Sequence, residues 1–64
     1  MIKVNGEMKP FDGMTAAELL AELNIPENRV AVELNGAILP RSEYGSAILR
    51  DGDSVELVTF VGGV

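Results

Sequence analysis

Two adjacent glycines near the end of the chain are the residues best suited to chemistry. Gly62 and Gly63 directly follow residues 58–61, a run of β-branched and aromatic residues typical of a strand, and Val64 comes after them. Because glycine has no Cβ, such a segment can enter a narrow channel and let a bulky group approach its backbone. A carboxylate at Gly63 would then be open to chemistry performed by another protein. In the sequence as it stands, a peptide bond to Val64 occupies that carboxyl group.

The side chains themselves offer little chemistry. The 64 residues include neither cysteine nor histidine, so they provide no thiol, no Ser–His or Cys–His pair and no group with an unperturbed pKa near neutrality. A chain this short also leaves little room for a substrate cleft of about 300 Å³ or more. Asp51 and Asp53 suggest a cation site, but Ca²⁺ needs about six oxygens, so a turn role is favoured. We therefore expect no enzymatic activity, no metal and no cofactor.

The charge balance narrows the choice of partners. Ten acidic residues stand against five basic ones, which gives a net charge of −5. This balance argues against binding to nucleic acid or an anionic membrane, because phosphate contacts need clustered Lys or Arg. It suits a partner with a basic docking surface, and solubility alone is the alternative. The chain lacks the apolar run of a membrane span and the pattern of a signal peptide, so we expect a cytoplasmic protein.

Elements that position the glycines can be read from turn and periodicity signals. Asn5-Gly6 and Asn35-Gly36 each separate alternating segments and predict two hairpins, over residues 2–11 and 30–39. Pro10 cannot donate to a ladder, so residues 7–11 should form an edge strand. Thr15 and Glu18 form a capping-box pattern that opens an amphipathic helix, which should end near Asn24. Residues 41–50 form a polar connection, expected to be anchored by Tyr44, Ile48 and Leu49.

Residues 54–61 are predicted to form the last and longest strand. We expect it to lie at the centre of the sheet and to pair in parallel with the first strand. The expected fold class is α+β, with a mixed sheet of about five strands packed on one helix in a β-grasp, or ubiquitin-like, arrangement. The predicted organisation is one domain over residues 1–61 and a flexible tail over residues 62–64. Alternation along the last strand leaves Val58 and Phe60 on the open face of the sheet, where they would form an apolar patch. The alternative is that Phe60 packs beneath the 41–50 connection.

Several segments together resemble the thiamine-biosynthesis sulfur carrier proteins of the ThiS family. They are the helix over residues 15–23, Val32-Glu33-Leu34-Asn35-Gly36, Pro40-Arg41, Asp51-Gly52-Asp53 and the strand leading into Gly62-Gly63. The resemblance implies a β-grasp fold and a carboxylate at Gly63 that an E1-like adenylyltransferase adenylates with ATP. Sulfur from a cysteine desulfurase or another donor would then give a thiocarboxylate, which thiazole synthase would consume. Gly62 would thread the tail into these partners.

Partner contacts are expected at Val58, Phe60 and Val61, with Arg41 as a further candidate. The sequence departs from the family pattern at Val64, since members usually end at Gly-Gly. We favour removal of Val64 by a peptidase. The alternatives are an addition made for expression and a copy that is inactive as it stands.

Other functions remain open on the residues alone. A carrier for molybdopterin or another sulfur-containing metabolite would use the same glycines, and so would a ubiquitin-like protein modifier. A binding module with an idle glycine tail is a further alternative. Deletion of residues 62–64 would abolish the function of a carrier and leave the partner of a binding module bound.

Overall fold

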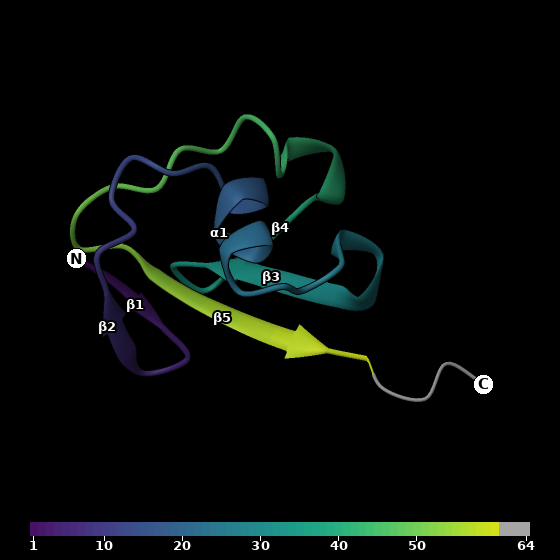
Figure 1. Cartoon of the computed structure of the whole chain (residues 1–64), viewed down its shortest axis with the longest axis horizontal. Coiled ribbons are helices and arrows are strands. Elements are labelled where there is room, and N and C mark those ends of the chain that lie inside the picture. Colours follow the sequence, from purple (N-terminus) through teal and green to yellow (C-terminus); the bar gives the residue numbers. More distant parts are fainter. Residues whose placement is uncertain (61–64) are drawn as a thin grey trace.

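The structure, a computed structural model, describes residues 1–60, which form a mixed sheet of five strands with one α-helix on one face (Figure 1). The strand order is β2-β1-β5-β3-β4; β1 and β5 are parallel and the other pairs are antiparallel. This architecture confirms the predicted β-grasp fold and the central place of the last strand. The elements are β1 (Ile2–Val4), β2 (Glu7–Lys9), α1 (Ala16–Glu22), β3 (Val30–Leu34), β4 (Ala37–Leu39) and β5 (Ser54–Thr59), with 3₁₀ turns η1 (Glu27–Arg29) and η2 (Arg41–Glu43).

Both Asn-Gly turns adopt the backbone that hairpin closure requires. The φ angles are 48° and 86° at Asn5 and Gly6, and 51° and 86° at Asn35 and Gly36. Such left-handed values suit Asn and Gly and match the twist of the flanking strands. The β2 strand lies at the sheet edge as predicted, but it ends at Lys9 instead of residue 11. Pro10 follows directly and supplies no N–H to a ladder.

The predicted capping box opens α1. The Thr15 hydroxyl accepts from the Glu18 N–H at 3.1 Å, and the Glu18 carboxylate accepts from the Thr15 N–H at 2.8 Å. The helix ends at Glu22, slightly before the expected position, and Asn24 takes a left-handed φ of 58°. Seven residues are too few for an independently stable helix, so packing on the sheet must hold it. Its buried side chains join those of the strands in one core: Ile2, Val4, Ala16, Leu19, Leu20, Val30, Val32, Tyr44, Leu49, Val55 and Leu57.

The connection from residue 41 to residue 50 is anchored by two of its three predicted residues. Tyr44 and Leu49 are buried, and the Tyr44 hydroxyl donates to the Val30 carbonyl at 3.3 Å. The prediction for Ile48 is wrong, because its side chain is 55% exposed. Residue 48 forms an isolated β-bridge with Thr15, and extended backbone there turns successive side chains to opposite sides. Leu49 therefore faces the core and Ile48 faces outward.

No helix within residues 1–60 is long and apolar enough to cross a lipid bilayer.

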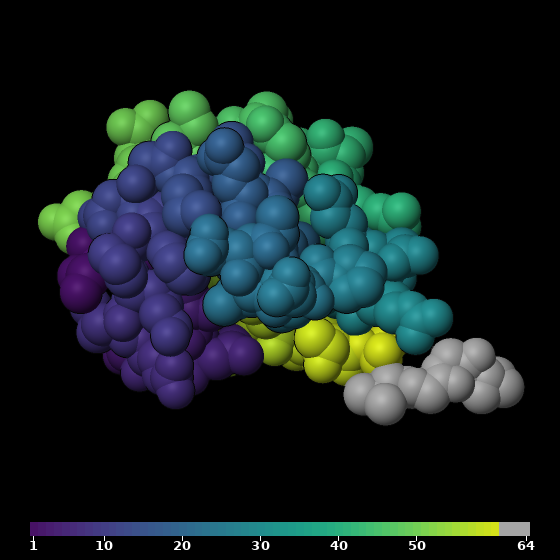
Figure 2. All heavy atoms as spheres, in the orientation of Figure 1, coloured from purple at the N-terminus to yellow at the C-terminus, as the bar shows by residue number. Residues whose placement is uncertain are grey.

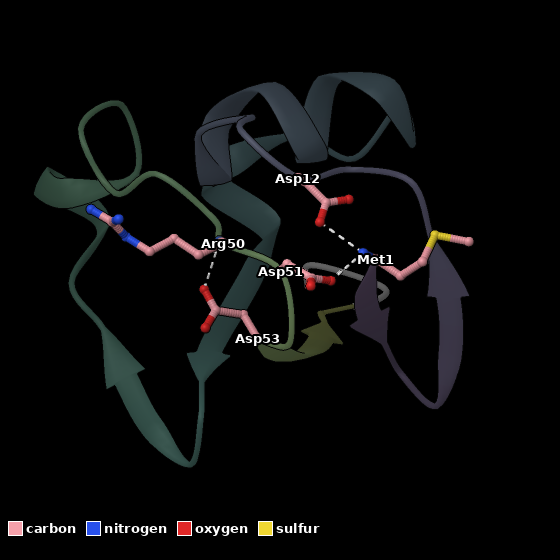
Figure 3. Close-up of polar contacts among 5 residues, drawn as sticks. All are labelled: Met1, Asp12, Arg50, Asp51 and Asp53. Carbon is pink, nitrogen blue, oxygen red and sulfur yellow. Dashed lines mark hydrogen bonds and ion pairs between the residues drawn. The ribbon is translucent and has the colours of Figure 1, made fainter.

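The chain start and two turns are joined by a small polar cluster (Figure 3). The Met1 ammonium donates to Asp12 at 2.7 Å and to Asp51 at 2.6 Å. Asp53 accepts from the backbone N–H of Arg50 at 2.9 Å, which closes the turn between them. This contact confirms the turn role expected for Asp53, whereas the Asp51 carboxylate binds the chain start. Within residues 1–60, no group of three or more Asp or Glu side chains is arranged to hold a metal ion.

This cluster predicts a pH window for stability. The hydrogen bonds that the Met1 ammonium donates to Asp12 and then to Asp51 raise its pKa above the ordinary value of 8.0. The hydrogen bond from that ammonium lowers the pKa of Asp12 below its ordinary 3.8. The ammonium contribution is therefore complete below pH 8.0 and is lost as pH rises through the raised pKa. The Asp12 contribution is complete above pH 3.8 and is lost as pH falls through the lowered pKa.

We expect the Asp12→Asn/Asp51→Asn double variant to lose less stability than the wild type between about pH 7 and pH 10, in the range set by the raised pKa of the ammonium. The effect should be small, because exposed ion pairs contribute little. Thermal unfolding followed by circular dichroism at both pH values measures it. All other charged side chains are common to both proteins, so their effects cancel in the comparison. An equal fall in melting temperature for both proteins would exclude this role.

Candidate functional site at the end of the central strand

The last strand presents a buried row to the helix and an exposed row to the opposite face. Val55 and Leu57 are 1% and 9% exposed, whereas Val58 and Phe60 are 53% and 57% exposed. This alternation confirms that Val58 and Phe60 lie on the open face. The alternative, in which Phe60 packs beneath the 41–50 connection, is wrong. The open face therefore carries large apolar side chains directly before the glycine pair.

Neighbouring strands extend this surface into an open-face patch, which we define as Glu33, Ile38, Glu56, Val58 and Phe60. Ile38 is 69% exposed. Register places Glu33 between Ile38 and Glu56, so two carboxylates face each other across β3 and β5. Like charges in directly opposed positions disfavour the sheet. A basic side chain of a partner between them would relieve that repulsion, so the patch suits a partner with apolar and basic groups.

The structure brings together only some of the predicted site residues. Val58 and Phe60 lie on the same face of β5 and its extension. Arg41 begins η2 after the β4 edge strand, two strands away from β5, which is about 10 Å at the usual strand spacing. Arg41 therefore lies beside the patch and not within it. Val61, Gly62, Gly63 and Val64 lie outside the described residues, so the roles and the domain boundary assigned there stay predictions.

Backbone pairing holds β5 almost up to the glycines. The antiparallel ladder with β3 continues to the pair Val30 and Thr59. One residue further, the Phe60 N–H donates to the Arg29 carbonyl at 2.8 Å. Phe60 is therefore held by the sheet although its side chain is exposed. A fixed strand end of this kind gives the segment that follows a defined starting point and direction.

Two turn asparagines also bind β5, a role that the sequence did not indicate. The Asn5 side-chain oxygen accepts from the Leu57 N–H at 2.7 Å, and its amide donates to the Leu57 carbonyl at 3.3 Å. On the other side, the Asn35 side-chain oxygen accepts from the Ser54 N–H at 2.9 Å. The Asn-Gly motif explains the turn backbone but says nothing about the side chain. Each asparagine side chain therefore bonds to the β5 backbone as one more strand residue would, and extends the pairing at the end of its hairpin.

A groove on the helix side of the sheet corrects the expectation that the chain has little room for a cleft. Its volume is about 410 Å³. Polar residues enter it from the hairpin, where Lys9 pairs with Glu7 at 3.3 Å. The remaining lining is mostly apolar. The full lining is Val4, Asn5, Glu7, Lys9, Leu23, Ile25, Leu57 and Thr59.

Comparison with known proteins gives matches that cover nearly the whole chain. The model of the ThiS family matches residues 2–63. The chain is 40% identical over 63 residues to the sulfur carrier protein ThiS of Thermus thermophilus, and the match covers 98% of each. It is 44% identical over 61 residues to a thiazole synthase of Paramagnetospirillum magneticum. That match covers 94% of this chain, which spans only 19% of the length of that relative.

A solved structure agrees with the fold and the length. The crystal structure of the thiamine biosynthesis protein ThiS from Geobacter metallireducens superposes with a TM-score of 0.77 at 34% identity. The match covers 98% of this chain and 97% of that one.

Proposed function

Because this chain belongs to the ThiS family, we propose that it carries sulfur for the synthesis of the thiazole moiety of thiamine. The reactive group is the carboxylate of Gly63, freed from Val64. An E1-like adenylyltransferase joins that carboxylate to AMP and releases pyrophosphate from ATP. The terminal sulfur of a persulfide, supplied by a cysteine desulfurase or another donor, then attacks the acyl adenylate and displaces AMP to give an acyl disulfide. A thiol reductant cleaves this disulfide, which leaves the thiocarboxylate on Gly63 and carries away the donor's thiol as a new disulfide. The carrier is a substrate of these enzymes and not an enzyme itself, and we place the reactions in the cytoplasm.

The observation that carries this proposal is the position of the glycine pair after a fixed central strand. β5 is paired with β1 at its start and with β3 up to Thr59, and the last described backbone bond lies at Phe60, two residues before Gly62. A carrier needs a rigid body that partner enzymes can grip and a slender segment that enters their active sites. The absence of Cys and His supports placing the sulfur on the backbone carboxylate.

Thiazole synthase is the proposed recipient of the sulfur. In the Paramagnetospirillum magneticum relative named thiazole synthase, a region similar to this chain shares one polypeptide with the rest of that protein. Such linkage raises the effective concentration of one part at the other. We propose that this chain meets a thiazole synthase as a separate partner, and that a peptidase supplies the chain ending at Gly63.

The open-face patch is the proposed docking surface for these partners, with Arg41 beside it, and Val61 is a further proposed contact. Its exposed apolar groups and its opposed carboxylates suit a partner surface with an apolar centre and a basic residue. Phe60 is the proposed anchor, because aromatic side chains dominate such contacts.

Complementation tests the proposed function. In a bacterial strain that lacks its own sulfur carrier, the chain ending at Gly63 should restore growth without added thiamine. The chain ending at Val61 has the same described fold and should not restore it. Growth with both chains would favour a binding module. Restoration of a molybdopterin-dependent activity instead of thiamine synthesis, or lysine-linked adducts of the chain, would favour the two alternative functions.

A further inference from the structure

The second half of β5 has a strand edge that the rest of the described chain leaves open. β1 pairs with β5 only at Ser54 and Val55 and ends at Val4. The Asn5 side chain extends that pairing by one step, to Leu57. Figure 1 shows the hairpin of β1 and β2 stopping well short of the end of β5. We call the side of β5 beyond Asn5, at Thr59, the free edge.

Hydrogen-bond alternation turns the backbone of Thr59 toward this free edge. In the ladder with β3, the Phe60 N–H points to β3, where it meets Arg29. The Leu57 N–H points the other way, to Asn5. Because the direction alternates along a strand, the Thr59 N–H and carbonyl point the same way as those of Leu57. Within residues 1–60, no strand lies beside the Thr59 N–H and carbonyl on that side of β5.

The 410 Å³ groove runs along the helix side of the same edge. Leu57 and Thr59 are the β5 residues that line the groove, and Leu23 and Ile25 also line it. A strand added at the free edge would turn every second side chain into this groove. Figure 2 shows the atoms of β5 exposed where the hairpin no longer covers them. Unpaired backbone beside a groove that can take alternate side chains is the arrangement that binds an extended peptide.

We propose that the free edge binds an extended segment of a thiazole synthase, which adds a strand to β5 and places an apolar side chain in the groove. This inference rests on the proposed function for its partner. Two features of the free edge support this proposal. The Thr59 N–H and carbonyl match the hydrogen-bonding groups of an extended backbone. The paired Glu7 and Lys9 offer one negative and one positive group to polar side chains of the added strand that flank its apolar side chain. The added strand lies beside the residues that lead to Gly63. The contact therefore aligns the glycine segment with the partner that receives its sulfur.

Thr59→Pro tests the edge selectively. Proline removes the outward N–H and leaves the ladder with β3 intact, as it does at strand edges. Thr59→Val is the matched control, because it keeps the N–H and has nearly the same shape. With the thiazole synthase of the same organism, we expect Thr59→Pro to weaken binding about tenfold and Thr59→Val to bind like the wild type. Circular dichroism should show the same fold for all three.

Amide hydrogen exchange gives an independent readout on the unmodified chain. The Thr59 amide should exchange rapidly in the free protein and at least about tenfold more slowly in the saturated complex. Tight binding of the wild type with unchanged Thr59 exchange, or equal binding of both variants, would overturn the edge contact and leave the proposed function standing. Failure of the wild type to bind the synthase would overturn both.

Discussion

The chain ending at Gly63 is expected to support ATP–pyrophosphate exchange by the purified adenylyltransferase, whereas the 64-residue chain is expected to be at least about 10²-fold slower. In the longer chain, the Gly63 carboxyl group is held in a peptide bond, and the free carboxylate lies one residue further on. That residue advances the reacting oxygen by about 3.3 Å along an extended backbone. A displacement of only about 1 Å already costs roughly 10²-fold in rate.

Val64→Gly separates the two effects of the extra residue. It keeps the chain at 64 residues but removes the branched side chain. If the position of the carboxylate determines the exchange rate, Val64→Gly stays as slow as the wild-type chain. If the side chain blocks the channel, exchange recovers. Equal exchange by the 63-residue and 64-residue chains would show that Val64 does not obstruct activation and would remove the need for a peptidase.

Phe60→Ala is expected to weaken binding to the adenylyltransferase by about 2 kcal/mol, roughly thirtyfold, with little change in melting temperature. The side chain is 57% exposed, so its removal leaves no cavity in the core. On docking, the ring would become buried and would contribute apolar area to the interface. Calorimetric titration measures the affinity, and thermal unfolding checks the fold.

Met8→Ala is the matched control for Phe60→Ala. Met8 is also 57% exposed and lies on the same open face, since it pairs with Lys3 between the buried Ile2 and Val4. It belongs to β2, at the sheet edge two strands from β5. We expect its removal to leave affinity unchanged. Equal losses from both variants would mean that the whole face docks, and a loss of folding in Phe60→Ala would mean that the residue is structural.

Local sequence signals predicted most of the fold because each had a separate physical cause. Positive φ at Asn5 and Asn35, the capping box at Thr15 and the missing N–H of Pro10, which indicated an edge strand, act within a few residues. The central position of β5 followed from its length and β-branched composition. The exposure of Val58 and Phe60 followed from simple alternation once Val55 and Leu57 were assigned to the core.

Features that depend on distant contacts escaped prediction. Ile48 is apolar and lies beside Leu49, and only the bridge between Thr15 and Ile48 shows which of the pair faces inward. The amide of Asn5 meets Leu57, which is 52 residues away, so no local motif indicates it. The groove is lined by residues of the first hairpin, of the segment after the helix and of β5, which are far apart in the sequence. Local signals cannot show that these three segments meet.

Intact-mass measurement of the 63-residue protein shows directly whether Gly63 accepts sulfur. The protein is incubated with the adenylyltransferase, ATP, a persulfide donor and a thiol reductant that releases the thiocarboxylate, and fragmentation then locates any change. The expected mass gain equals the exchange of one oxygen for sulfur, is located at Gly63 and is absent without ATP. An unchanged mass under conditions in which the adenylyltransferase sulfurates another ThiS-family carrier would contradict the role proposed for Gly63.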